Sequence, residues 1–234
     1  LPKVSHYLHV PAQHGSDDVL ARMKRGYTIG EYMEMLSRIR EAIPQVAVTS
    51  DFIVGFCGET EAEFQLSLDL VRTAGFKNSF IFKYSPRPGT KAHERLPDDV
   101  PEEVKKERNR LLLEAQTEAS LAGNQPFLGT RQQVLVEGLS ARDEKREVDV
   151  GPDGVAQLTG RTMCDRIVVF DAPVRLVGRL VDIDIHEAGA WVLTGNVADG
   201  LAEAVPLEEL PLGGGFATNL YDISLPHAPP RPAA

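Results

Sequence analysis

The sequence predicts an α/β unit with a parallel sheet, followed by a small all-β barrel of the OB type. Short β-branched runs alternate with helical patterns up to about residue 97, which is typical of parallel strands joined by right-handed crossovers. From Gln132 the pattern changes to five short apolar runs separated by Gly, Asp and Pro, and this spacing is typical of a small barrel. The length of 234 residues is enough for one or two domains.

Each element of the α/β unit has its own local evidence. Thr28 with Glu31, and Thr60 with Glu63, have the spacing of capping boxes, so each pair predicts the first turn of a helix. Apolar residues at helical spacing follow both pairs, and we expect these helices to end near residues 44 and 75. Three apolar runs are predicted to form the strands, over 7–10, 46–55 and 79–84.

The rest of the chain divides at a predicted linking helix. Pro101 followed by two glutamates is a favourable helix start, because Pro is tolerated in the first turn and acids suit the positive end of the helix dipole. We therefore expect an α/β unit over 1–100, a linking helix over 101–124 and a β-barrel over 125–197. The remaining tail, 198–234, has a Pro- and Ala-rich end and is predicted to be disordered.

Composition argues against several classes of protein. The net charge of −9 disfavours a general nucleic-acid binder, because phosphate binding depends on clustered Lys and Arg. An acidic protein can still bind RNA through a local basic patch. We find neither a membrane-length apolar run nor a signal peptide. Two cysteines, Cys57 and Cys164, do not make a disulfide framework, so we expect both to be buried in a cytoplasmic protein. The histidines lack the spacing of metal ligands, and no metal site is predicted.

Polar, glycine-containing segments follow all three strands of the α/β unit. They cover residues 9–16, 51–60 and 84–90. Parallel α/β proteins bind their ligands just beyond the carboxyl ends of the strands. One such segment is weak evidence, because glycine-rich turns are common for structural reasons alone, but three after consecutive strands predict a ligand site.

Four motifs then occur in a specific order: H-x-P-x-Q-x-G-S from His9, M-K-R-G-Y-T from Met23, D-F-I-V-G-F-x-G-E-T from Asp51 and Y-S-P-R-P-G-T from Tyr84. This order resembles the second half of the radical-SAM domain of MiaB-type tRNA methylthiotransferases. The later runs VLVEG, LTGRT and RIVVF are similar to the TRAM domain that ends those enzymes. The resemblance implies the second half of a partial (βα) barrel of the radical-SAM type, followed by a TRAM-like barrel.

The resemblance also implies an activity and its cofactors. Enzymes of this family add a methylthio group at C2 of N6-isopentenyladenosine 37 of tRNA, using S-adenosylmethionine and two [4Fe-4S] clusters. It implies that Ile53-Val54-Gly55 pack against the adenine of S-adenosylmethionine, and that Arg25 and Arg87 are candidates to pair with a carboxylate or phosphate. The full set of candidate cofactor-binding residues is Gln13, Ser16, Arg25, Asp51, Ile53, Val54, Gly55 and Arg87. For Arg25 the competing interpretation is a charge on a helix surface, and for Ile53 it is ordinary core packing. No catalytic residue is predicted.

The expected partner is tRNA, through its anticodon stem-loop. The resemblance assigns RNA contact to polar residues of the TRAM-like segment, namely Lys145, Arg146, Arg161, Thr162 and Arg166. The competing interpretation is a solvated barrel surface. The sequence also departs from the family at His14, where relatives usually have Ser, and at Cys57, where they usually have Pro. We expect the first change to perturb the cofactor pocket and the second to loosen a turn.

The largest departure concerns the cluster cysteines. The family binds one cluster through C-x-x-x-C-x-x-C and the other through three more cysteines, and neither set occurs in this sequence. The sequence also begins at Leu1, so we expect a missing N-terminal portion of the same enzyme as a partner and an inactive chain without it. Two alternatives stay open: a relative that methylthiolates a ribosomal protein, which the Arg87-Pro88 pair disfavours, and a non-catalytic RNA-binding remnant or split reading frame.

Overall fold

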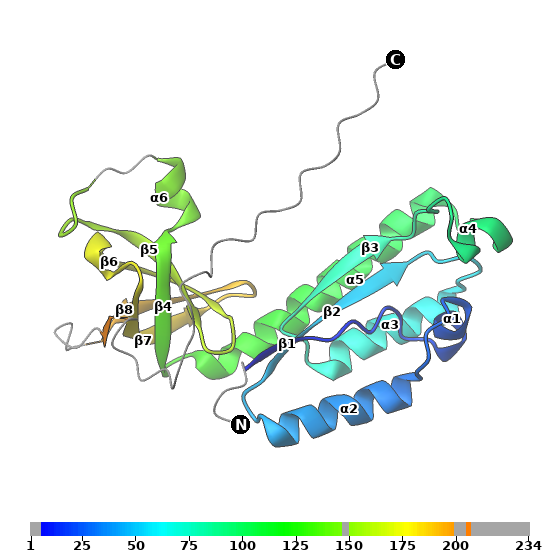
Figure 1. Cartoon of the computed structure of the whole chain (residues 1–234), viewed down its shortest axis with the longest axis horizontal. Helices are drawn as coiled ribbons and strands as arrows, with labels where there is room; N and C mark the ends of the chain where they lie inside the picture. Colours follow the sequence, from blue (N-terminus) through cyan, green and yellow to red (C-terminus); the bar gives the residue numbers. More distant parts are fainter. Residues whose placement is uncertain (1–5, 147–149, 199–204, 207–234) are drawn as a thin grey trace, which may run out of the picture.

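The computed structural model describes residues 6–146, 150–198 and 205–206, and within them it forms two units joined by a long helix (Figure 1). The predicted disordered tail, apart from Ala198 and the pair at 205–206, lies outside the described residues. Among the described helices, none is long and apolar enough to cross a membrane.

The α/β unit contains a three-stranded parallel sheet in the order β1-β2-β3. The strands are β1 (Tyr7–His9), β2 (Ala47–Val54) and β3 (Asn78–Lys83). The helices are α1 (Asp17–Arg22), α2 (Ile29–Ala42), α3 (Glu61–Ala74), α4 (Lys91–Arg95) and α5 (Glu102–Asn124). The expected parallel α/β arrangement is thus confirmed, whereas α1 and α4 were not predicted.

Both predicted capping boxes are present. The Thr28 hydroxyl accepts a hydrogen bond from the Glu31 backbone N–H at the start of α2, and the Glu31 carboxylate accepts from the Thr28 backbone N–H. Thr60 and Glu63 make the same pair of bonds at the start of α3. Since each box satisfies helix N–H groups that have no partner within the helix, these sequences begin helices at defined residues. Gly75 ends α3 in the left-handed conformation, with φ of 63°.

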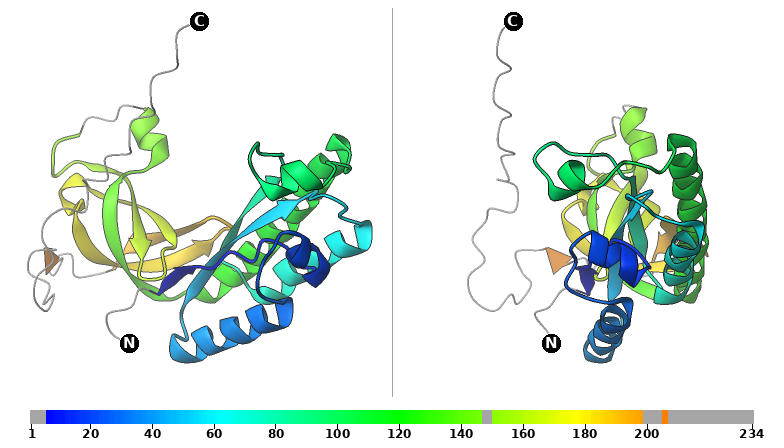
Figure 2. Two further views of the ribbon diagram at one scale, coloured as in Figure 1. Left: turned by 45° about the vertical axis from the view of Figure 1, so that its right-hand side comes forward. Right: turned by 90° about the vertical axis from the view of Figure 1, so that its right-hand side faces the viewer.

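Helices cover one face of the sheet and leave the other face open. Phe52, Phe64 and Phe76 are fully buried between the sheet and the helices, and α5 runs along the sheet towards the second unit (Figure 2). On the opposite face Phe80 and Phe82 are 51% and 54% exposed. Successive strand residues point to opposite faces, so these two phenylalanines share a face.

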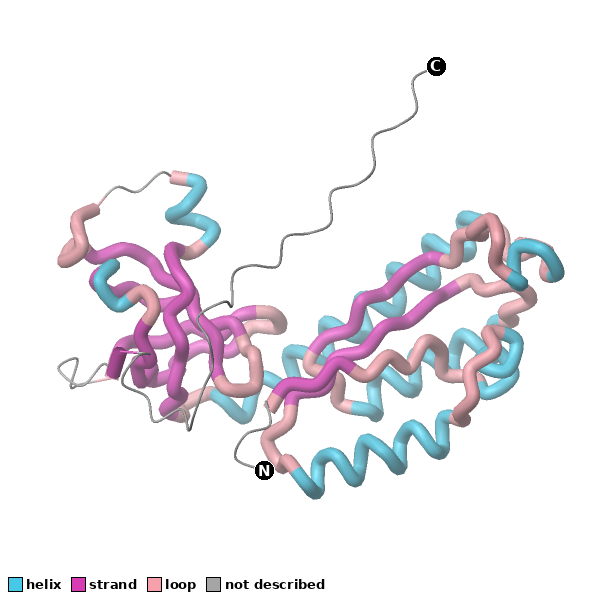
Figure 3. Tube along the Cα trace, viewed as in Figure 1, coloured by secondary structure: helices cyan, strands magenta, loops and turns pink. Residues whose placement is uncertain are grey.

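The second unit is a closed five-stranded barrel, as expected for this segment. Its strands are β4 (Arg131–Leu139), β5 (Val155–Thr162), β6 (Ile167–Pro173), β7 (Arg179–Ala188) and β8 (Val192–Val197), and a short β9 (Val205–Pro206) pairs with β7. The order β4-β5-β6-β8-β7 is closed by pairing of β7 with β4, and β6 and β8 run parallel. Figure 3 shows the strands of both units in magenta and the helices in cyan. Short helices α6 (Ala141–Lys145), η1 (Gln125–Phe127) and η2 (Val174–Leu176) complete the unit. Leu158, Phe170 and Leu193 lie in its apolar core.

Polar contacts tie the barrel to the end of the sheet at which the strands begin. The Lys77 ammonium lies 2.6 Å from an Asp165 carboxylate oxygen. Asn124, the last residue of α5, donates from its side-chain amide to the carbonyl groups of Gly189 and Ala190 at 2.8 and 3.1 Å. The barrel therefore has a defined position relative to the α/β unit.

Candidate functional site

The three ligand segments predicted from the sequence meet at the carboxyl ends of the strands. A cavity of about 560 Å³ there is lined by residues from all three, including Gln13, Asp51, Ile53 and Arg87. A neighbouring cavity of about 570 Å³ shares Arg25 and Ile53 with it. We call this pair of adjoining cavities the mouth of the sheet.

The backbone of Gln13 places its side chain at the mouth. Gln13 has a left-handed φ of 70°, an uncommon conformation for a non-glycine residue that is often found at functional sites. Its N–H donates to the Asp51 carbonyl at 2.8 Å, and its carbonyl accepts from the Ile53 N–H at 2.9 Å. The Gln13 side-chain carbonyl accepts from the Arg25 guanidinium at 2.9 Å. The two predicted residues Gln13 and Arg25 are therefore brought together and orient each other.

The residues of Ile53-Val54-Gly55 have different positions. The Ile53 side chain lines both cavities of the mouth, whereas Val54 is fully buried in the core on the other face of the sheet. Gly55 has φ of 71°, and a Cβ atom there would lie 2.3 Å from Cγ of Lys105. The turn therefore requires glycine, because a side chain would be both strained and in steric conflict.

A buried network of charged residues holds the turn containing Gly55 in place. The Glu59 carboxylate lies 3.1 Å from His14 Nε2 and 3.4 Å from the Arg108 guanidinium, and it also accepts from the Gly55 backbone N–H. The side chains of His14 and Glu59 are completely buried. A buried carboxylate needs partners of this kind, because an unpaired charge in the interior is costly. His14 belongs to this network, and the expectation that it perturbs the cofactor pocket stays a prediction.

Ser16 lies apart from the mouth. Its hydroxyl accepts from the Val19 backbone N–H at 3.4 Å and caps α1, and its own N–H donates to His14 Nδ1 at 3.0 Å. The side chain is buried and lines neither cavity. Its predicted contact with cofactor or substrate is still untested, but the structure gives Ser16 a role in positioning the segment that carries Gln13.

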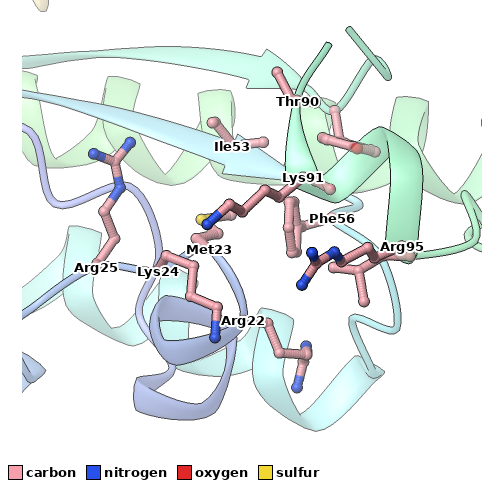
Figure 4. Close-up of a pocket in the computed structure, with 12 residues that line it drawn as sticks. Arg22, Met23, Lys24, Arg25, Ile53, Phe56, Thr90, Lys91 and Arg95 are labelled. Atoms are coloured by element: carbon pink, nitrogen blue, oxygen red, sulfur yellow. The ribbon is translucent and has the colours of Figure 1, made fainter. Parts of the chain in front are cut away.

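A rim of basic side chains surrounds one cavity of the mouth. Arg22, Lys24, Arg25, Lys91 and Arg95 line it, and none of the described residues that line it is acidic (Figure 4). Lys24 has a left-handed φ of 61°, and Lys91 and Arg95 are four residues apart on α4, hence on one face of that helix. Only Arg25 of this group was predicted. The M-K-R-G-Y-T motif contained Lys24, and the i, i+4 spacing was the signal available for Lys91 and Arg95. Arg22 had no signal of its own in the sequence.

Aromatic and aliphatic residues form the floor of the same cavity. Phe56 and Tyr84 make an edge contact with ring centroids 4.9 Å apart, and Met23, Ala92 and Leu96 pack around them. Burial and a hydrogen bond with Cys57 raise the pKa of Tyr84 to about 12, so its phenol stays protonated at physiological pH. The mouth thus combines an apolar floor, a neutral phenol and a basic rim, a combination suited to a ligand that has an aromatic ring and a carboxylate or phosphate group.

The predicted RNA contacts of the barrel are distributed over both of its ends. Lys145 and Arg146 are exposed at the end of α6, whereas Arg161 and Arg166 line a cavity at the junction with the α/β unit. Thr162 is buried, and its hydroxyl accepts from the Arg166 backbone N–H at 3.1 Å. The structure therefore brings together Arg161 and Arg166 and separates them from the α6 pair.

The two cysteines lie in separate parts of the molecule. Cys57 is buried beside the mouth, and Cys164 is buried next to Thr162 in the barrel. In the described ranges no group of three or more His, Cys, Asp or Glu side chains is arranged to hold a metal ion. Iron–sulfur clusters need several thiolate ligands, so the residues of this chain do not fit one.

Comparison with known proteins gives the family. Residues 3–71 match the model of the Radical SAM superfamily. Three relatives carry the name tRNA-2-methylthio-N(6)-dimethylallyladenosine synthase. The Rhodopirellula baltica protein is 55% identical over 197 residues, which are 84% of this chain and 40% of that protein. Those of Moorella thermoacetica and an Acidovorax species are 43% and 44% identical over 86% of this chain and 42% of each relative.

The chain thus spans about two fifths of the length of these relatives. The similarity extends well beyond the superfamily match and includes most of the barrel. In the part that it spans, this chain is a member of the MiaB-type tRNA methylthiotransferases of the radical-SAM superfamily.

Proposed function

We propose that this chain forms the cofactor-binding mouth and the RNA-binding barrel of a tRNA methylthiotransferase. The expected reaction is methylthiolation at C2 of N6-isopentenyladenosine 37, next to the anticodon. The observation that carries the proposal is the convergence of Gln13, Arg25 and Ile53 at the mouth, together with relatives named for this reaction. Such an enzyme meets its tRNA in the cytoplasm.

The mouth has the chemistry to hold S-adenosylmethionine. Ile53 offers an apolar surface for the adenine ring, and Arg25 is placed by Gln13 so that its guanidinium faces the cavity and can pair with the carboxylate. Asp51 and Arg87 add polar groups to the same wall. When bound, the cofactor supplies radical chemistry. The protein side chains bind and orient it and keep water from the apolar floor.

The iron–sulfur clusters are a different case. Only two cysteines occur in the whole sequence. Cys57 lies in an apolar cluster beside the mouth, and Cys164 lies in the barrel next to Thr162 and Arg166. We therefore assign both cluster sites to polypeptide outside this chain, equivalent to the part of the relatives that it does not span. Under this assignment, the side chains of residues 1–234 bind the cofactor and the RNA, and other polypeptide supplies the cluster thiolates.

We further propose that the five-stranded barrel is a TRAM domain of the OB type and that it binds the anticodon stem-loop. Arg161 and Arg166 at the junction, and Lys145 and Arg146 on α6, supply cations. The rim residues Lys24, Lys91 and Arg95 add cations close to the cofactor site. The chain as a whole carries a charge of −9, so these local groups account for any attraction to phosphate.

A chimeric enzyme tests the catalytic proposal. The N-terminal part of the Rhodopirellula relative, up to the point where the similarity begins, is fused to residues 1–198 of this chain and loaded with iron and sulfide. Mass spectrometry of nucleosides from a tRNA bearing N6-isopentenyladenosine should then detect the methylthio product. A chimera that holds its clusters and cleaves S-adenosylmethionine, yet leaves this tRNA unmodified, would reject the assignment.

A non-catalytic RNA-binding role for the chain alone is the second candidate, and the cysteine count favours it. Filter binding of an anticodon stem-loop at increasing salt separates the two candidates. RNA binding by a chain whose chimera is inactive would favour the binding module, whereas an active chimera favours the enzyme. The absence of any salt-sensitive binding would reject RNA as a ligand of the isolated chain.

A further inference from the structure

A cavity of about 290 Å³ lies where the barrel meets the beginning of the parallel strands, away from the mouth. We call it the junction cavity. Its sheet side consists of residues at or near the starts of β1, β2 and β3, and its barrel side is formed by the β5–β6 hairpin and the β7–β8 turn. The residues used below are Thr49, Lys77, Phe80, Arg161, Asp165, Arg166 and Trp191.

Two half-exposed aromatic rings line this cavity from opposite sides. Trp191 of the barrel is 49% exposed, and Phe80 of the sheet is 51% exposed. Phe80 makes an edge contact with His9, with ring centroids 6.2 Å apart. The turn that carries Trp191 is held by the Asn124 amide. Both rings are therefore positioned by the fold while keeping much of their surface open to a ligand.

The cavity is locally basic in an acidic chain. Three basic residues line it, against one carboxylate, although the net charge of the protein is −9. Asp165 bridges Lys77 and Arg161, at 2.6 and 2.8 Å. Arg166 contacts no carboxylate among the described residues, and its guanidinium stacks 4.2 Å from the Phe127 ring centroid. Glu137, which does not line the cavity, also pairs with Arg161 at 3.2 Å. One positive charge, that of Arg166, is then left over and favours an anionic ligand.

The junction cavity is a near neighbour of the mouth. Thr49 lines the junction cavity and Ile53 lines the mouth. These residues are four positions apart on β2, which is about 13 Å at 3.3 Å per strand residue. The open face of the sheet connects the two, and Phe80 and Phe82 lie on it. A flexible anionic chain could thus reach both cavities along one surface.

We propose that the junction cavity binds an unstacked base of the RNA whose target adenosine lies at the mouth, by stacking on Trp191 and Phe80. The inference rests on the proposed RNA substrate and adds to it a base-binding site between the two units. Single-stranded nucleic acids are commonly held in this way, because every base has a π-face and an adjacent cation attracts the phosphate. Lys77, Arg161 and Arg166 provide that cationic setting.

Trp191 is the single tryptophan of the sequence, so its fluorescence reports on this cavity alone. An anticodon stem-loop carrying N6-isopentenyladenosine is titrated into the intact chain, and Trp191 emission is measured beside filter retention. Base stacking should quench the emission with the same midpoint as retention. Retention with unchanged Trp191 emission would overturn the inference and leave the proposed function intact. No retention at all would overturn the inference and reject RNA as a ligand of the isolated chain, and the chimera would still test the catalytic proposal.

Substitutions identify the ring as the cause. Trp191→Ala should weaken stem-loop binding about 5- to 150-fold, and Trp191→Phe should restore most of it. Val155→Ala is the matched control, because Val155 is 61% exposed on the barrel and does not line the cavity; it should bind as the unchanged protein does. Equal binding by Trp191→Ala would overturn the inference. Trp191 emission that changes with protein concentration in the absence of RNA would also overturn the inference, because a second copy of the chain would then occupy the cavity.

Discussion

The α/β unit buries charged side chains beside its candidate site, whereas the barrel interior is almost wholly apolar. Glu59, Lys105 and Arg108 are all buried beneath the mouth. In the barrel the buried polar side chains of the described residues are few, namely Ser140, Asp143 and Thr162. Asp143 pairs with the half-exposed Arg142, whereas other pairs, such as that of Arg131 with Asp184, lie on the surface.

This difference indicates what each unit does. Buried ion pairs add little net stability over apolar packing, since desolvation offsets the attraction between the charges. In the α/β unit the buried ion pairs instead hold one turn, the turn containing Gly55, in a single geometry. The barrel, whose core is apolar, needs no such network to close, and its polar groups are available at the surface and at the junction. The following substitutions measure this contrast.

Glu59→Ala should have the largest effect. It leaves His14 and Arg108 buried without their shared carboxylate, so we expect the free energy of unfolding to fall by about 3–5 kcal/mol. Asp184→Ala, which breaks a surface pair of the barrel with both side chains about half exposed, should cost about 0–1 kcal/mol. Urea denaturation of the two variants measures both. Similar losses would mean that the buried network is no more important than a surface pair.

Gly15→Ala and Gly160→Ala place the same kind of steric conflict in each unit. A Cβ atom at Gly15 would lie 2.3 Å from the Leu66 carbonyl oxygen of α3, and one at Gly160 would lie 2.4 Å from the Leu135 carbonyl oxygen of β4. Each backbone must shift, at a cost of about 1–3 kcal/mol.

Hydrogen exchange followed by mass spectrometry should locate the faster exchange in the unit that carries each substitution. Gly26→Ala is the control, because nothing lies within 4 Å of its added Cβ, and it should leave exchange unchanged. Faster exchange throughout the chain for either variant would show that the two units unfold together, so that the contrast between their interiors has no separate consequence for stability.

Local signals in the sequence predicted the elements and the location of the mouth. The capping boxes at Thr28 and Thr60 depend on residues three positions apart, and the mouth follows from the rule that ligands bind beyond parallel strands. The junction was not predictable in this way. Lys77 and Asp165 are 88 positions apart, and no local pattern pairs them. The cap that Ser16 provides for α1 was not predicted either, because α1 itself was not.

Among the substitutions in the α/β unit other than the control, Glu63→Gln should have the smallest effect, and it should have the clearest dependence on pH. Burial alone would raise the pKa of the Glu63 carboxyl, but hydrogen bonds from Arg22 and Thr60 outweigh burial and lower it to about 2. Because the pKa is lower in the folded state than the ordinary 4.5, the carboxylate stabilises the protein fully above about pH 4.5 and progressively less as the pH falls towards 2.

At neutral pH we therefore expect Glu63→Gln to lower the free energy of unfolding by about 1 kcal/mol, the typical contribution of a helix cap. The difference from the unchanged protein should shrink between pH 4.5 and 2, as urea denaturation at several pH values would measure. Glu114→Gln, which alters an exposed pair with Arg110 on α5, is the control and should differ little at any pH. A difference in the free energy of unfolding that stays constant down to pH 2 would show that Glu63→Gln acts through packing or geometry and not through charge. The ionised Glu63 carboxylate would then not stabilise the α/β unit.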